Sequence, residues 1–195
     1  MNFLAHAYLS FDQKEILVGN MISDFVKGKT QYQFIAGIQN GIKLHRSIDA
    51  YTDAHPLIKE AKELFRKDYR LYSGPIVDIL LDHYLANNPD YFNPLSLQLF
   101  TKSVYKILEE YTAHLPLRFV SVLSYMKVED WLFNYQYQHG IERSIRGMVR
   151  RSSFLYDSSK AVELFHTHYD DLKSLSALFI KDVKMHAKEQ LSLAN

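Results

Sequence analysis

Apolar residues recur at helical spacing along nearly the whole chain, and this periodicity constrains the fold more than any other feature. Ile58, Ala61, Leu64 and Phe65 repeat every three or four residues, the spacing that places side chains on one face of a helix. No segment shows the alternation of polar and apolar residues that is typical of a strand. Only seven Gly and five Pro interrupt the 195 residues, which leaves room for long helices. The sequence therefore predicts an all-α helical bundle.

The expected helices follow one another without a linker or an internal repeat. Turn and capping residues place them at about 3–10, 14–27, 31–54, 57–72, 75–87, 94–111, 117–126, 129–138 and 141–152, with a last helical region after 159 that is broken near 170–171. A chain of this length suits one domain with a sizeable core. We therefore expect residues 1–195 to form a single helical domain.

Composition excludes several kinds of site. The chain has no Cys, which rules out disulfides, thiolate zinc sites and cysteine nucleophiles. Any metal ion must be held by His and carboxylate groups, a donor set that suits Mn, Mg, Fe or Zn. The net charge of +1 provides no overall field that would attract nucleic acid. The residues at the start lack the pattern of a signal peptide, and no apolar run is long enough to span a membrane. We therefore expect a cytoplasmic protein that binds neither nucleic acid nor membrane.

A polar stripe runs along the helix expected at 31–54. His45, Asp49 and Asp53 follow one another at intervals of four residues, so their side chains lie on one helix face, a turn apart. A His and a carboxylate at this spacing can bind one metal ion. The alternative is a solvated helix face, or a His that simply pairs with an Asp.

A second polar group lies in the apolar helix expected at 75–87. Asp78 and Asp82 are four residues apart, and His83 follows directly. Like charges at that spacing repel by about 0.2–0.5 kcal/mol even in solvent, and an unpaired carboxylate costs far more when it is buried. A divalent cation held between them, or between them and His45, removes both costs. The alternative is that both aspartates point to solvent.

Basic residues gather at two places. Arg143, Arg146, Arg150 and Arg151 crowd into nine residues, and the first three form one helical stripe. A smaller group on the helix expected at 57–72 holds Arg66, Lys67 and Arg70. Each group is either an ordinary solvated face or a dock for an acidic partner or a phosphate.

Seven segments together resemble a known family. They are residues 1–6 (MNFLAH), Gly19-Asn20, residues 24–28 (DFVKG), residues 45–56 (HRSIDAYTDAHP), Ser73-Gly74, residues 78–86 (DILLDHYLA) and residues 140–151, which begin GIER. In these positions the chain resembles the bacterial acyl carrier protein phosphodiesterases over almost its whole length. The string His-Arg-x-Ile-Asp at 45–49 is the most specific part of the resemblance.

The resemblance implies a metal-dependent phosphodiesterase. The family is regarded as a divergent branch of the HD-domain phosphohydrolases, which are all-helical and use a His/Asp site with a divalent ion, commonly Mn2+, with Mg2+ or Fe2+ as alternatives. The implied reaction hydrolyses the 4′-phosphopantetheine diester of holo-acyl carrier protein to apo-protein and free 4′-phosphopantetheine. This chain lacks the adjacent His-Asp pair of the usual HD branch, and its Asp82-His83 has the reverse order.

The chemistry of this implied reaction suggests roles for single residues, although the ligand positions of the usual HD branch do not carry over directly. The expected metal ligands are Asp24, His45, Asp49, Asp78, Asp82 and His83. Arg46 is expected to hold a phosphate oxygen, and His6 or Asp53 to relay a proton to the serine leaving group. Taken alone, Asp24 is more typical of a surface residue and His6 of a packed, hydrogen-bonded histidine.

Acyl carrier protein, which is strongly acidic, is the expected partner, and it would dock on Arg143, Arg146, Arg150 and Arg151 or on Arg66 and Arg70. Two alternatives stay open. One is an HD-type hydrolase of a nucleotide or another small phosphoester, and the other is a non-catalytic helical protein that binds an acidic partner. The sequence leaves the oligomeric state open.

Overall fold

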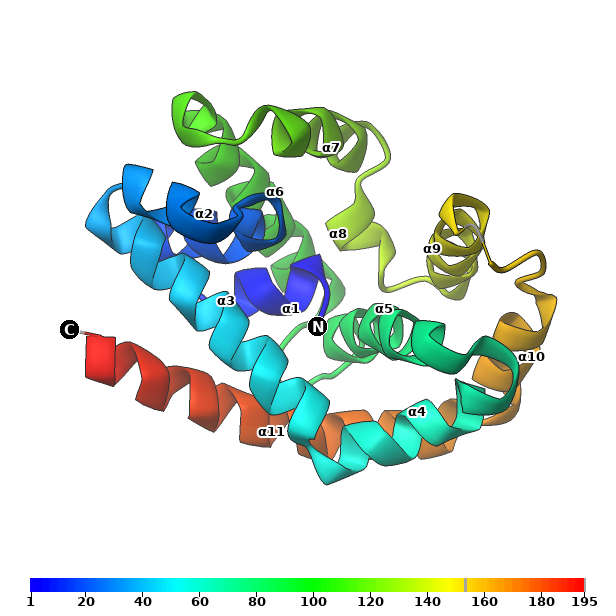
Figure 1. The fold of residues 1–195 in the computed structure, drawn as a ribbon. Coiled ribbons are helices and arrows are strands. Elements are labelled where there is room, and N and C mark those ends of the chain that lie inside the picture. The colour runs from blue at the N-terminus through cyan, green and yellow to red at the C-terminus, as the bar shows by residue number, and fades with distance from the viewer. Residues whose placement is uncertain (153, 195) are drawn as a thin grey trace.

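The computed structural model describes residues 1–152 and 154–194, and within them the prediction of an all-α fold is confirmed, because no strand occurs. Figure 1 shows the arrangement of the helices. They are α1 (Phe3–Tyr8), α2 (Lys14–Ile22), α3 (Ala36–Ala54), α4 (Pro56–Tyr69), α5 (Ser73–Ala86), α6 (Pro94–Glu110), α7 (Leu117–Val128), α8 (Trp131–Asn134), α9 (Gln138–Arg151), α10 (Ser159–Thr167) and α11 (Tyr169–Ala194), with short 3-10 turns between some of them.

Local sequence explains where several helices begin. Pro56 and Pro94 occupy the first turns of α4 and α6, where the missing N–H costs nothing. Asn93 and Ser96 form a reciprocal capping box at the start of α6, which satisfies two backbone donors that the helix leaves free. The expected break in the last helical region lies at His168, between α10 and α11.

Several predicted helix boundaries differ from the structure, including the end of α2 at Ile22 instead of 27; the differences at α3 and α8 have a clear local cause. Helix α3 begins at Ala36, because a 3-10 segment (Gly28–Gln33) with Gly28 in the left-handed region comes first. The helix expected at 129–138 is only the single turn of α8, because Asp130 before it has a φ of 43° and Tyr137 after it is extended. Both differences come from backbone conformations that hydrophobic spacing alone does not reveal.

The first helix lies at the centre of the bundle. Helix α1 packs against α2 and α5, and the long helix α11 runs across α3, α4 and α5 (Figure 1). The buried apolar side chains form one continuous cluster. None of the helices in the described ranges is both long and apolar enough to cross a bilayer.

Helices α2 and α3 make the most extensive contact in the bundle, and two glycines bring them together. A Cβ atom on Gly19 would lie 2.1 Å from the carbonyl oxygen of Ile38, and one on Gly41 would lie 2.3 Å from that of Ile16. The two backbones therefore touch where any side chain would force them apart. This close contact places Asn20, the next residue of α2, against His45 of α3.

Candidate metal centre

Two histidines and one aspartate meet between α1 and α3. His6 of α1 and His45 of α3 are buried, with exposed fractions of 2% and 5%. The Nε2 atoms of His6 and His45 lie 3.2 Å from Asp49 Oδ1 and 3.2 Å from Asp49 Oδ2, respectively. One ligand atom from each of the three residues falls within 4.8 Å of the others, a spacing that could hold a metal ion. We call His6, His45 and Asp49 the His/Asp cluster.

Asn20 of α2 orients both histidines. Its Oδ1 lies 2.8 Å from His6 Nδ1, and its backbone oxygen lies 2.7 Å from His45 Nδ1. The Nδ2 of Asn20 donates to the His6 carbonyl and to Ser10 Oγ, so Oδ1 is the acceptor and each histidine donates its Nδ1–H. The two rings stack with centroids 3.9 Å apart, and both Nε2 atoms face Asp49. Such second partners fix the tautomer and orientation of metal-binding histidines.

The three residues of the His/Asp cluster have pKa values that are shifted in different directions. Burial and the neighbouring His45 lower the pKa of His6 to about 4. Burial also opposes the charge on His45, but hydrogen bonds to Asp24 and Asp49 raise its pKa to about 9. Burial disfavours the charged form of Asp49 as well, yet its contacts with His45, His6 and the Met1 amino group hold its pKa well below the usual range. The cluster is therefore built for an ionised Asp49 that lies between cationic groups.

The donor set suits a divalent ion. His6 Nε2 is buried and makes no hydrogen bond of good geometry within the described part of the chain, although Asp49 is near. A neutral imidazole whose Nδ1–H is already donated offers a lone pair at Nε2, which is what a metal ion needs. Asp24, in the 3-10 turn after α2, adds an exposed carboxylate 3.2 Å from His45 Nε2. Nitrogen and carboxylate donors are the ligands of Mn, Fe and Zn sites.

The three candidates on α5 lie at different places. Asp78 Oδ1 is 3.2 Å from the Met1 amino group, which is also 3.2 Å from Asp49 Oδ1, so Asp78 adjoins the cluster through one cation. Asp82 is fully buried and accepts hydrogen bonds from the backbone N–H groups of Leu4 and Ala5 at 2.9 and 3.0 Å. Burial raises its pKa to about 7 although both N–H groups favour its charged form.

His83 faces away from the N-terminal residues. Its Nδ1 lies 2.7 Å from the carbonyl oxygen of Tyr135, and its Nε2 lies 2.9 Å from the hydroxyl of Tyr169. Both ring nitrogens thus have protein partners, and His83 links α5 to α8 and α11. The structure does not bring His83 or Asp82 into the His/Asp cluster.

Arg46 and Asp53 also make contacts outside the cluster. Arg46 donates to the side chain of Gln31 and to the carbonyl of Val26, so it holds the segment before α3. Asp53 is exposed and pairs with Lys62 of α4. Only part of the stripe predicted on α3 therefore belongs to one site. His45 and Asp49 face α1, whereas Asp53 faces solvent.

The arginines predicted to dock a partner are exposed, and several already have carboxylate partners. Arg143 pairs with Glu129 and Arg146 pairs with Glu142. Arg66 pairs with Glu63 three residues earlier. Arg150 and Arg151 end α9 and form no ion pair with any described residue. Arg70 follows α4 with a positive φ of 46°.

Comparison with known proteins places the chain in a family. A family model described as acyl carrier protein phosphodiesterase matches residues 1–183. The chain belongs to the acyl carrier protein phosphodiesterase family. It is 34% identical over 191 residues to the acyl carrier protein phosphodiesterase of Yersinia pestis, covering 97% of this chain and 99% of that protein.

Two further members of the family agree. The identity is 34% over 176 residues with the protein of the same name from Photorhabdus laumondii subsp. laumondii, covering 90% of this chain and 89% of the relative. It is 35% over 174 residues with that from Klebsiella pneumoniae strain 342, covering 89% and 90%. No solved structure matches the chain.

Sequence reasoning gave Asn20 no role in the site. It appeared only as part of the Gly19-Asn20 segment shared with the phosphodiesterase family. A usable signal was present, because an Asn within the apolar run ILVGNMI must find hydrogen-bond partners once it is buried. His6 was expected to relay a proton; the structure places its Nε2 beside Asp49, and its role stays a prediction.

Asp82→Ala should lower the free energy of unfolding by about 2–4 kcal/mol, because two buried N–H groups at the start of α1 lose their acceptors and a cavity remains. Urea denaturation of the chelated protein measures this loss. Asp53→Ala is the matched control, since an exposed ion pair contributes only about 0–1 kcal/mol. A loss of metal affinity in the folded Asp82→Ala protein, without a loss of stability, would instead make Asp82 a ligand.

Proposed function

We propose that this protein is a divalent-metal-dependent phosphodiesterase that hydrolyses the 4′-phosphopantetheine group from holo-acyl carrier protein. The products are apo-acyl carrier protein and free 4′-phosphopantetheine. One observation carries the proposal: a chain of this family holds two stacked, buried histidines whose Nε2 atoms converge on one aspartate.

The residues of the cluster have separate tasks in this proposal. His6, His45 and Asp49 hold the ion, and Asp24 lies at its exposed edge. A divalent ion supplies neutralisation of the phosphodiester charge and lowers the pKa of water that it binds. Mn2+ is our first candidate, with Mg2+ or Fe2+ as alternatives, because the donors are imidazole and carboxylate. The histidine and carboxylate donors on packed helices also support an HD-like helical fold in one domain.

Asn20 and Asp24 prepare the site for the reaction. Asn20 holds both imidazole rings through their Nδ1–H groups, so the Nε2 atoms need no reorientation when an ion binds. Asp24 has a side chain that is 74% exposed, and its hydrogen bond to His45 lowers its pKa. It is therefore an ionised carboxylate at the edge from which substrate and water arrive. We assign it to orient the attacking water molecule.

The decisive experiment measures release of 4′-phosphopantetheine from holo-acyl carrier protein by the protein loaded with Mn2+ and again after chelation. We expect turnover with Mn2+ and none after chelation, with restoration on adding the ion back. A panel of nucleotides and small phosphoesters is assayed beside the carrier. Turnover of a nucleotide but not of the carrier would favour the small-phosphoester hydrolase, and absence of both metal binding and turnover would favour a non-catalytic binding protein.

Carrier docking should depend on the end of α9. Because Arg143 and Arg146 are already paired with glutamates, we propose Arg150 and Arg151 as the main contacts for the acidic carrier. Arg150→Glu combined with Arg151→Glu should raise the KM for the carrier by about tenfold at low salt, which corresponds to about 1.4 kcal/mol. The increase should shrink at high salt because exposed charges are screened.

The matched variant reverses the second basic group, with Arg66→Glu and Arg70→Glu. It should change the KM for the carrier less, because Arg66 is paired with Glu63. Steady-state kinetics on the carrier and on a small generic phosphodiester show whether a variant loses activity on the carrier alone. If both substrates lose the same factor in the α9 variant, these arginines serve the fold or the cluster and do not dock the carrier.

A further inference from the structure

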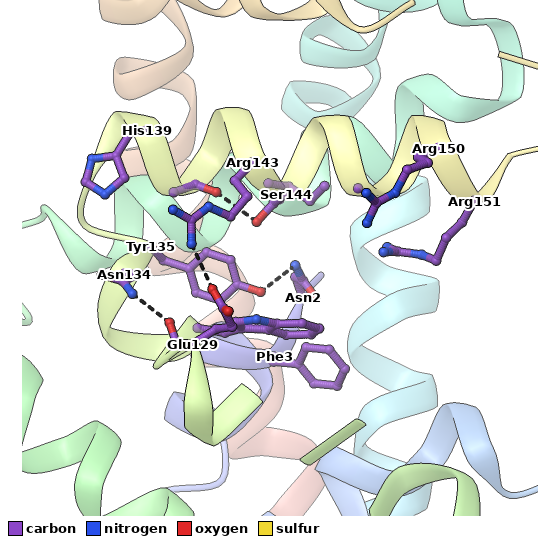
Figure 2. A pocket seen from close by; sticks show the side chains of 14 residues that line it. Asn2, Phe3, Glu129, Asn134, Tyr135, His139, Arg143, Ser144, Arg150 and Arg151 are labelled. Carbon is purple, nitrogen blue, oxygen red and sulfur yellow. Dashed lines mark hydrogen bonds and ion pairs between the residues drawn. The ribbon is translucent and has the colours of Figure 1, made fainter. Parts of the chain in front are cut away.

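A cavity lies beside the start of α1, apart from the His/Asp cluster. It has a volume of about 390 Å³ and lies between α8, α9 and the start of α1. Figure 2 shows side chains from these elements converging on it, with Phe3 and Tyr135 at its base and arginines of α9 at its rim. Its volume lies within the range of about 300–1,000 Å³ that is typical of small-molecule sites.

The lining combines ring faces with amide-binding groups. Phe3, Trp131 and Tyr135 supply aromatic surface, and Asn2 and Asn134 supply side-chain amides. The Asn2 amide donates to the Tyr135 hydroxyl at 3.1 Å, which fixes both groups at the wall. The lining is mainly apolar and holds a small number of fixed polar groups. Such a lining favours a ligand that has both apolar segments and amide groups.

The charged side chains in the inner part of the cavity neutralise one another. Arg143 is bound to Glu129 at 2.8 Å, and both residues line the cavity. Figure 2 shows this pair beside Tyr135, whereas Arg150 and Arg151 lie toward the other end of α9. The inner part is therefore polar without a net charge, and free positive charge remains only at one end. An uncharged chain fits the inner part, and an acidic protein fits the positively charged end.

Residues that line the cavity follow directly, in sequence, residues that contact the His/Asp cluster. Asn2 and Phe3 follow Met1, whose amino group contacts Asp49 and Asp78. Ile79, which lines the cavity, follows Asp78 on α5. A phosphodiester held at the cluster could therefore extend one of its two substituents into the cavity.

We propose that this cavity binds the pantetheine arm of the substrate, an inference that rests on the proposed function. The arm is a flexible, uncharged chain with two amide groups and a terminal thiol, and it is joined to the diester phosphate. Its amides match Asn2 and Asn134, and its alkyl segments match the rings of Phe3 and Trp131. The protein part of the carrier, being acidic and bulky, stays outside at the arginine rim.

Gly147 offers a way to fill the cavity without disturbing the core. It lies on α9 in the cavity wall, and within the described part of the chain an added Cβ comes close to the end of the flexible Arg151 side chain alone, at 3.3 Å. Gly147→Leu therefore places a side chain in the open space. Gly74→Leu is the matched control, because its Cβ would meet, of the described residues, just the end of Lys62 at 3.6 Å, and Gly74 does not line the cavity.

The experiment has a binding arm and a kinetic arm. Pantetheine without a phosphate, at millimolar concentration, should raise the melting temperature of the chelated wild-type protein and of Gly74→Leu, but not that of Gly147→Leu. Gly147→Leu should also lower the kcat/KM for holo-acyl carrier protein at least tenfold relative to that for a small phosphodiester. This loss should be the same at low and high salt. The effect of Arg150→Glu with Arg151→Glu, in contrast, should shrink at high salt.

The outcomes separate this inference from the proposed function. If the wild type cleaves holo-carrier but pantetheine causes no shift, or if Gly147→Leu keeps the same ratio, the cavity does not bind the arm and the function stands. A shift with adenosine monophosphate in place of pantetheine would also overturn the assignment. If the wild type does not cleave holo-carrier at all, the proposed function fails and this inference fails with it. If Gly147→Leu does not fold, the presence or absence of a pantetheine-induced shift in the wild type still tests whether the protein binds the arm.

Discussion

Asp49→Asn should reduce the turnover of holo-acyl carrier protein by more than about 100-fold, a loss at least as large as that from removing an outer partner of a metal ligand. Both oxygens of Asp49 are engaged, Oδ1 with His6 and Oδ2 with His45. An amide keeps the shape but offers one weaker acceptor and removes the charge that balances a cation. Steady-state kinetics with Mn2+ in excess measure the effect.

A second readout keeps this result from being ascribed to misfolding. Titration calorimetry should show Mn2+ binding at least about tenfold weaker in Asp49→Asn, while circular dichroism stays that of a helical protein. Asp53, one turn further along α3, has a side chain that is 77% exposed and pairs with Lys62 of α4, so Asp53→Asn should stay within about twofold of wild type. Full activity in Asp49→Asn would mean that the His/Asp cluster is not the reaction centre.

Gly19→Ala should lower the free energy of unfolding by about 3 kcal/mol, at the upper end of the usual cost of overpacking a core. The new Cβ would lie 2.1 Å from the carbonyl oxygen of Ile38 and 2.8 Å from Gly41 Cα. These are backbone atoms of α3, which cannot rotate away as the end of a side chain can. Helices α2 and α3 must therefore separate, and urea denaturation measures the cost.

Gly147→Ala is the matched control for this prediction. The same change in the interior of α9 meets only the flexible end of Arg151, so it should stabilise the protein by about 0.5–1 kcal/mol through helix propensity. Because α2 carries Asn20, Gly19→Ala should also weaken metal binding in the protein that remains folded. Equal stabilities of the two variants would show that the α2–α3 contact has room to relax.

The fold was largely predictable because most helices bury one face and begin or end at Pro, Asn or Gly. Helix α4 illustrates this, since Ile58, Ala61 and Phe65 repeat at helical spacing and are buried. Helix α5 does not, because it is buried on nearly every side, so periodicity could not tell which face Asp78 and Asp82 occupy. The helix around α8 was predicted too long because a left-handed Asp130 leaves no hydrophobic pattern.

The site was predictable only within one helix. The four-residue spacing fixes His45 and Asp49 on one face of α3, and the structure brings them together. Which other helix faces that pair depends on contacts between residues far apart in sequence. Asp82 looked like a ligand because a buried carboxylate needs partners, and it finds them in the N–H groups of Leu4 and Ala5. Spacing cannot distinguish a metal from backbone donors.

The glycine contact between α2 and α3 has a consequence for how freely the rest of the chain can vary. Where two backbones touch at Gly19 and Gly41, the separation of the helices is set by main-chain atoms and is independent of side-chain volume. Asn20 and His45 lie beside this contact, so substitutions among the apolar residues of α4, α6 or α11 can be absorbed elsewhere in the bundle. The position of His45 against Asn20 is thereby insulated from drift in the core, and much of the interior can change while the hydrogen bond between them is kept.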